Sequence, residues 1–251
     1  MSSIEISLIT FAFVFGGAML GILLRANLPE QHLATESKDA VKVGMGLVAT
    51  MVALVLGLLI ASAKSSYDTQ NSELTEMSSK IVLLDRVLAH YGPEAKAARE
   101  QLRSLVVHVI DQMWSKDSTG HSQLEPSTTG GEALYDTLEA LKPKDEAQRV
   151  TQSQAMNIAI GIGQTRWLMY EQRMNTISLP LLALLIFWLT ALFVSFGLFA
   201  PRNTTVVAAL FVSSLSVSGA ILLILEMYTP YQGIIRISDA PMRAALAHLG
   251  Q

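Results

Sequence analysis

The sequence predicts an all-α polytopic membrane protein with four transmembrane helices and a helical extramembrane domain between spans two and three. Of its 251 residues, 51% are hydrophobic and only 16% are charged, whereas soluble domains carry about 25% charged residues. The low proportion of charged residues is explained by four runs without any charge, at residues 6–24, 43–63, 174–201 and 203–225. Each run is long enough for a helix to cross a bilayer core about 30 Å thick, which takes roughly 20 residues.

Residues 1–63 predict transmembrane helices 1 and 2. No basic segment precedes the first run, since Glu5 is the only charge before it, so it is interpreted as a retained span rather than a secretory signal. The second run, Val43–Ala63, is apolar apart from Thr50 and Ser62. Its helical register continues through Tyr67 into the charged region that follows, so we expect span two to leave the membrane as one long helix.

Residues 64–178 are rich in charge and predict a helical extramembrane domain. Its first helix carries apolar residues at heptad spacing, and the dipeptide Gly92-Pro93 should end that helix. Two further segments repeat the helical periodicity. The three apolar seams are Leu74, Met77, Ile81, Leu84 and Leu88; Leu102, Leu105, Val106, Val109 and Met113; and Ile158, Ile162, Thr165, Met169 and Gln172. They fit packing within one subunit and packing between subunits equally well.

A stretch near residues 115–131 is rich in Ser, Thr and Gly and predicts a flexible loop. A short helix carrying Leu134, Leu138 and Leu141 should follow it and end at Pro143.

Residues 179–226 predict transmembrane helices 3 and 4, joined by the short link 200–204 as a tight antiparallel hairpin. Asn203 is in position to cap the fourth span. Residues 227–251 predict a short amphipathic C-terminal helix capped by Ser238 or Asp239. Its apolar face is Met242, Ala245, Leu246 and Leu249.

Span two carries a stripe of small residues every four positions, at Ala49, Ala53, Gly57 and Ala61. Helices in lipid associate where small side chains let their backbones approach closely, so these four residues are helix-packing candidates. They fit packing within one subunit, or an oligomer in which span two lines or flanks a central axis. In the second case Thr50, Leu54 and Leu58 are the pore-lining candidates, with Thr50 contacting an ion or water and the leucines forming an apolar constriction.

The sequence does not predict an enzyme, a cofactor or a metal site. It has no cysteine and therefore no thiolate ligands, and its five histidines are scattered without a metal-binding spacing. The net charge of −3 argues against nucleic acid as a partner. No charged residue lies deep within a span, because Lys64 and Glu226 stand at span ends, and this argues against proton-coupled transport.

Nearly the whole chain, apart from the stretch near residues 118–130, resembles the bacterial family of unknown function named bestrophin-like. The segments that carry the resemblance are Leu28–His32, Glu36–Asp39, Gly46–Gly57, Ala61–Asp68, Phe187–Thr190, Phe196–Asn203, Leu225–Glu226, Pro230–Gly233, Ile235–Ser238 and Pro241–Arg243. The layout is similar to that of bestrophins, which are pentameric anion channels with four spans, cytoplasmic termini and long cytoplasmic helices between spans two and three.

The resemblance implies an oligomeric channel for small anions, a pentamer by analogy, in the bacterial inner membrane with its termini and helical domain in the cytoplasm. The expected partners are therefore the lipid bilayer, further copies of the chain and small ions. The alternative hypothesis is a non-conducting membrane scaffold whose helical domain recruits a partner protein.

Overall fold

The computed structural model describes residues 2–29, 35–114, 128–174, 178–201 and 203–251. These residues form helices and no strand, which confirms the all-α prediction. The elements are α1 (Ser3–Asn27), α2 (Thr35–Tyr91), the 3₁₀ turn η2 (Pro93–Ala95), α3 (Lys96–Trp114), α4 (Thr128–Glu139), α5 (Glu146–Met174), α6 (Leu179–Phe199), α7 (Thr204–Met227) and α8 (Ala240–His248).

Four helices, α1, α2, α6 and α7, are long and apolar enough to cross a membrane, as the charge-free runs predict. The chain divides into two compact units, which are described separately. The first unit comprises residues 1–66, 176–229 and 233–235, and the second comprises residues 67–175, 230–232 and 236–251.

Helix α2 is a single helix of 57 residues, which confirms that span two continues beyond the apolar run. It ends where the sequence predicts, because Gly92 adopts a φ of +122°, a backbone conformation that side chains with a Cβ rarely accept. The Gln148 side-chain amide donates to the carbonyl of Tyr91 at 3.0 Å and so satisfies one of the free carbonyls at the helix end.

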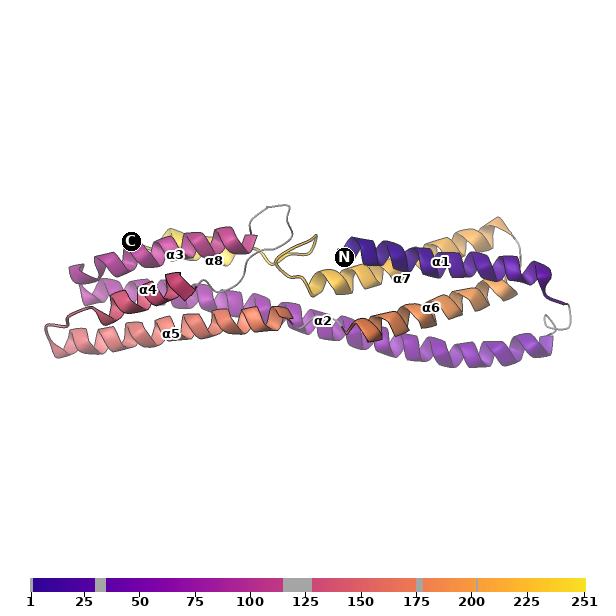
Figure 1. Cartoon of the computed structure of the whole chain (residues 1–251), viewed down its shortest axis with the longest axis horizontal. Coiled ribbons are helices and arrows are strands. Elements are labelled where there is room, and N and C mark those ends of the chain that lie inside the picture. The colour runs from indigo at the N-terminus through magenta and orange to yellow at the C-terminus, as the bar shows by residue number, and fades with distance from the viewer. Residues whose placement is uncertain (1, 30–34, 115–127, 175–177, 202) are drawn as a thin grey trace. The chain divides into compact units, whose positions relative to one another are not determined.

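In the first unit α1 lies alongside α6 and α7 (Figure 1). Glycines set the close approach of α1 and α6: a Cβ at Gly197 would collide with the carbonyl oxygen of Ala18. The Ser7 hydroxyl of α1 donates to the Ser218 carbonyl of α7 at 2.8 Å. Close backbone contact and interhelical hydrogen bonds are the interactions that hold helices together in lipid.

Caps mark the ends of the spans. Ser2 and Glu5 form a reciprocal capping box at the start of α1. The Asn203 side chain accepts the N–H of Val206 at 2.8 Å, which confirms the predicted cap of the fourth span. Because α6 ends at Phe199 and α7 begins at Thr204, these two spans form the expected short-linked hairpin, and the Arg25 guanidinium donates to the Ala200 carbonyl beside the link.

The second unit packs the remainder of α2 with α3, α4, α5 and α8 around one apolar core. The three predicted seams all contribute to this core or to its edge within a single chain. Of the two packing modes that the sequence left open, the seams therefore use the one within the subunit. Trp114 at the end of α3 fixes the C-terminal segment, since its indole N–H donates to the Ile237 carbonyl at 2.9 Å and its ring meets Tyr231 edge-on at 5.8 Å.

The loop predicted near 115–131 lies mainly outside the described residues, which omit 115–127. Its last four residues are helical, because α4 already begins at Thr128 and Gly130 lies against Leu105 of α3. At the other end of α4 the Gln152 amide donates to the carbonyls of Leu138 and Leu141 at 2.8 and 3.0 Å. Asp239 occupies the N-cap position of α8 without a side-chain cap bond, and the Ser238 hydroxyl accepts the N–H of Ala240 instead.

Candidate functional site

The apolar part of α2 is largely uncovered by the rest of its unit. Only 11% of its most apolar stretch is buried, compared with 33% for α1, 39% for α6 and 28% for α7. One seam, including Val52 and Leu59, packs into the core of the first unit. The remaining surface of this helix is apolar and meets either lipid or another protein chain.

The three predicted pore-lining residues all lie on this uncovered surface. Leu54 is 74% exposed and Leu58 is 69% exposed within the chain, and Thr50 is exposed as well. The Thr50 hydroxyl donates to the Leu47 carbonyl one turn earlier at 2.7 Å. Its proton is therefore used within the helix, while the lone pairs of its oxygen remain able to accept a bond.

Three of the four residues in the small-residue stripe on α2 are not covered by the described part of the unit, and the fourth, Ala49, packs against the edge of its core. Ala53, Gly57 and Ala61 are exposed and Ala49 is half-buried. A Cβ placed at Gly57 would meet no atom within 4 Å. This helix therefore carries a surface suited to close helix packing that its own subunit does not use.

Helix α1 carries a comparable stripe at Gly17 and Gly21, which packs against α6 of the same chain. A Cβ at Gly17 would lie 3.0 Å from the Thr190 side chain of α6, and one at Gly21 would collide with the Val194 carbonyl. Both glycines are buried. The small residues of α1 thus make a helix contact within the subunit, and those of α2 do not.

A buried carboxylate at the end of α7 is a feature that sequence reasoning did not assign. Glu226 is only 3% exposed, and its Oε2 accepts the backbone N–H groups of Ile234 and Ile235, the latter at 3.4 Å. Gly233 makes this turn possible, because its φ is +82° and a Cβ there would collide with the carboxylate. The sequence feature that could have indicated this contact is a glutamate at the end of a span, followed seven residues later by a glycine.

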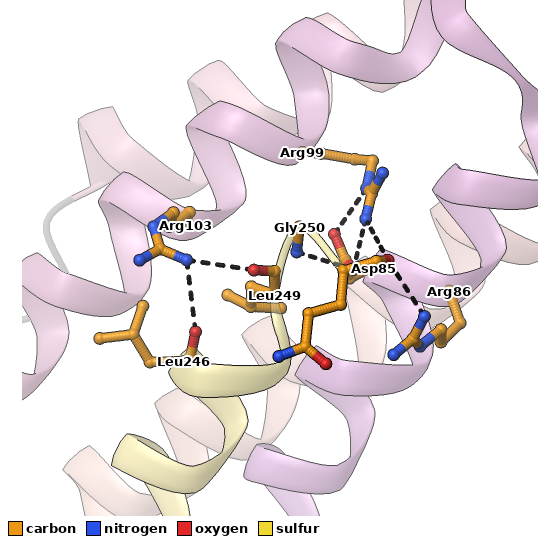
Figure 2. Close-up of polar contacts among 8 residues, drawn as sticks. Asp85, Arg86, Arg99, Arg103, Leu246, Leu249 and Gly250 are labelled. Atoms are coloured by element: carbon orange, nitrogen blue, oxygen red, sulfur yellow. Dashed lines mark hydrogen bonds and ion pairs between the residues drawn. The ribbon is translucent and has the colours of Figure 1, made fainter.

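In the second unit an ion pair anchors the segment after α8 (Figure 2). Arg99 of α3 donates two hydrogen bonds to Asp85 of α2, from Nε at 2.7 Å and from Nη2 at 2.9 Å. The Asp85 side chain is 2% exposed and that of Arg99 is 23% exposed. The N–H of Gly250 also donates to the carboxylate, at 3.3 Å, so three donors surround one buried anion.

These contacts shift the titration of both groups. Burial acts to raise the pKa of Asp85, but the hydrogen bonds from Arg99 and Gly250 and the charges of Arg99 and Arg86 hold it below its ordinary value of 3.8. The hydrogen bond to Asp85 raises the pKa of Arg99. Arg103 adds a bond to the Leu249 carbonyl at 3.1 Å, as Figure 2 also shows. The cluster is consequently a structural anchor for α8.

The described residues contain no group of three or more His, Asp or Glu side chains placed to hold a metal ion. The arrangement in this part of the chain consists of two apolar cores, an uncovered membrane helix and polar contacts that join helix ends.

Comparison with known proteins gives one family match. The model of the Bestrophin-like domain matches residues 12–242, which is most of the chain and covers the greater part of α1 and all of α2, α6 and α7. The curated proteins provide no significant match to the sequence.

Proposed function

The chain belongs to the bestrophin-like family, and we propose that it acts as an oligomeric channel for small anions, with α2 nearest the conduction axis. The uncovered face of α2 is the observation that carries this proposal. A membrane helix with an unused stripe of small residues fits an interface with further copies of the chain. Five copies are expected by analogy with bestrophins.

Side chains of α2 would define the conduction path. In a symmetric ring, Leu54 and Leu58 from each copy would form an apolar constriction, which gates by excluding water when it narrows. Thr50 lies one turn away, and because its proton goes to the Leu47 carbonyl, its hydroxyl oxygen would contact the path by accepting a hydrogen bond from water. Membrane conduction then depends on how far these leucine rings open, and no chemical step is required.

The environment of Glu226 supports a channel over proton-coupled transport. A coupled transporter uses a carboxylate that exchanges protons within the membrane. The Oε2 of Glu226 is engaged by two backbone N–H groups in a turn whose glycine cannot be replaced without a collision. This carboxylate serves as a fixed acceptor for the turn.

The second candidate function is a non-conducting membrane scaffold, and one observation favours it. Between residues 43 and 61 the sequence has a single hydroxyl, Thr50, and its proton goes to the Leu47 carbonyl. A path without a cationic or N–H-rich lining offers an anion little compensation for its lost hydration. Under this reading α2 only joins copies together, and the helical domain recruits a partner.

Planar-bilayer recording separates the two functions. Purified full-length protein under a chloride gradient should give discrete currents whose reversal potential follows chloride. Leu54→Ser should raise the open probability by wetting the constriction, whereas Leu23→Ser, an exposed position on α1, should leave the currents unchanged. If folded, oligomeric protein gives no current over a range of voltage, pH and calcium concentration, the result would favour the scaffold.

The oligomer itself has a matched test. Gly57→Leu adds a branched side chain to the α2 stripe, and Gly16→Leu adds the same group to α1 at a position that is equally open within the subunit. Light scattering of the detergent-solubilised protein should show dissociation for Gly57→Leu and the parent mass for Gly16→Leu. An unchanged mass for both variants would contradict the role given to α2.

We also propose that the protein lies in the bacterial inner membrane with its termini and helical domain in the cytoplasm, as the bestrophin layout implies. The sequence has no cysteine, so single cysteines can be introduced without background at Ser2, Ser153 and Gln251. An impermeant thiol reagent applied to intact spheroplasts should label none of the three and should label all of them after lysis. Labelling of Ser153 alone before lysis would overturn the four-span topology.

A further inference from the structure

A cavity of about 710 Å³ lies inside the second unit, between α2, α3, α4 and α5, with Met242 of α8 at one side. This volume falls within the roughly 300–1,000 Å³ of small-molecule sites. Its inner walls are apolar and include Met77, Leu102, Val106 and Ile162. A cavity of this size with an apolar lining is far larger than the voids that remain in a packed core.

Two glycines keep the cavity open. Gly131 and Gly163 both line it, and a Cβ at either position would meet no atom within 4 Å. The outer edge consists of large apolar side chains that stay exposed, with Trp167 at 49% and Leu168 at 51%. The cavity is therefore accessible from one side and would present apolar surface to water if nothing filled it.

One cation lies in this apolar lining. Arg166 of α5 is half-buried, and its Nη2 donates to the Gln112 amide oxygen at 3.4 Å. Burial lowers the pKa of Arg166, and no carboxylate of the described residues offsets this effect. Glu132 and Glu171 also line the cavity, but both are exposed, and among the described residues neither pairs with this guanidinium. A cation that is half-buried among apolar side chains loses part of its hydration, and this is costly without an anionic partner.

We propose that this cavity binds a single-chain anionic amphiphile, a long-chain carboxylate of the fatty-acid class. The alkyl chain lies among the apolar walls, and the carboxylate pairs with the Arg166 guanidinium. Arginine binds carboxylates through two parallel hydrogen bonds, so the ligand supplies an anionic partner that none of the described residues provides. Arg166 is the only cation among the described residues that line the cavity, so it gives the site one head-group position and selects amphiphiles with a negative charge.

The dependence of binding affinity on the length of the ligand's alkyl chain tests whether the ligand occupies this cavity. Each methylene removed from water strengthens binding about fourfold, so affinity should rise with chain length until the cavity is full and then level off. Partition into a bilayer instead keeps rising with length, because a bilayer places no limit on an extending chain. The plateau distinguishes a cavity in the protein from simple solution of the ligand in the membrane.

The test uses full-length protein in nanodiscs and palmitate with a diazirine near the chain end. After irradiation, mass spectrometry should find labelled peptides from α3 and α5, and labelling of α1, α6 and α7 reports the ligand dissolved in the bilayer. Excess palmitate should remove the α3 and α5 labels, whereas methyl palmitate, which has no charge, should not. Competing fatty acids of increasing length should show the plateau.

Two pairs of variants isolate the head-group site and the chain site. Arg166→Gln should lower labelling of α3 and α5 about tenfold or more, while Arg149→Gln, on the exposed part of the same helix, should not. Gly163→Leu should fill the cavity and abolish the label, while Ala147→Leu, exposed on α5, should retain it. Labels confined to the membrane helices, or equal competition by methyl palmitate, would overturn the proposal even if a variant failed to fold.

Discussion

Replacing Arg99 with methionine should loosen α8 more than any other single change in the cluster of Figure 2. The substitution keeps the aliphatic length of the side chain and removes two of the three donors to Asp85. The Gly250 N–H, at 3.3 Å, would remain as a donor to the carboxylate, with the charge of Arg86 nearby. Since the Asp85 side chain is 2% exposed, water cannot readily replace the lost bonds.

The size of the effect follows from this burial. Removing one partner of a buried ion pair costs about 3–5 kcal/mol, and the 23% exposure of Arg99 places this pair near the lower value. A cost of about 3 kcal/mol corresponds to roughly a hundredfold change in an opening equilibrium, because each factor of ten takes about 1.4 kcal/mol. The opening in question is release of α8 and Gly250 from α2 and α3.

Hydrogen exchange read by mass spectrometry measures that opening directly. Peptides from α8 should exchange about a hundredfold faster in Arg99→Met, whereas Arg86→Gln should change them little, because Arg86 makes one exposed bond at 3.1 Å. In the double variant Asp85→Leu with Arg99→Met, the uncompensated charge is gone and protection should largely return. Unchanged exchange in Arg99→Met, or a double variant as labile as the single one, would refute a buried charge as the cause.

Three further outcomes follow from the helix contacts and from the titration of Asp85. Gly21→Leu should prevent close packing of α1 on α6, because even a Cβ collides with the Val194 carbonyl; proteolysis in detergent should show a released α1. Gly233→Ala should lower the melting temperature by several degrees, since it strains a φ of +82° and displaces the Glu226 carboxylate, and an unaltered melting curve would contradict this. The lowered pKa of Asp85 means that its ion pair contributes its full stability above about pH 3.8 and loses it as the pH falls through the lowered value, so α8 should keep its slow exchange until the solution is more acidic than that.

Sequence periodicity was enough to predict the helices and several of their ends. Charge-free length identified the four spans, heptad spacing identified the continuation of α2, and the cap at Asn203 and the stop at Gly92 follow from local backbone chemistry. These features depend on residues within a few positions of one another. Such signals can be read from the chain without knowledge of its tertiary contacts.

The contacts between distant segments could not be predicted in the same way. Asp85 meets Gly250 across 165 positions, and neither residue has a local pattern that indicates the other. Glu226 was correctly located at a span end, but its burial depends on the return of the chain at Gly233. The cavity beside Arg166 likewise arises where four helices meet, and no single helix carries its signal.

The small-residue stripes on α1 and α2 show why residue spacing alone does not identify a helix interface. Gly17 and Gly21 recur every four residues on α1, as do Ala53 and Gly57 on α2. The stripe on α1 has a partner because α6 presents Gly197 opposite it, and the two backbones meet there. In the described residues no such partner faces Gly57. A leucine at Gly21 therefore acts on the fold of one subunit, whereas a leucine at Gly57 can act only through a surface outside it, so comparing the two variants distinguishes folding from assembly without assuming that the protein conducts ions.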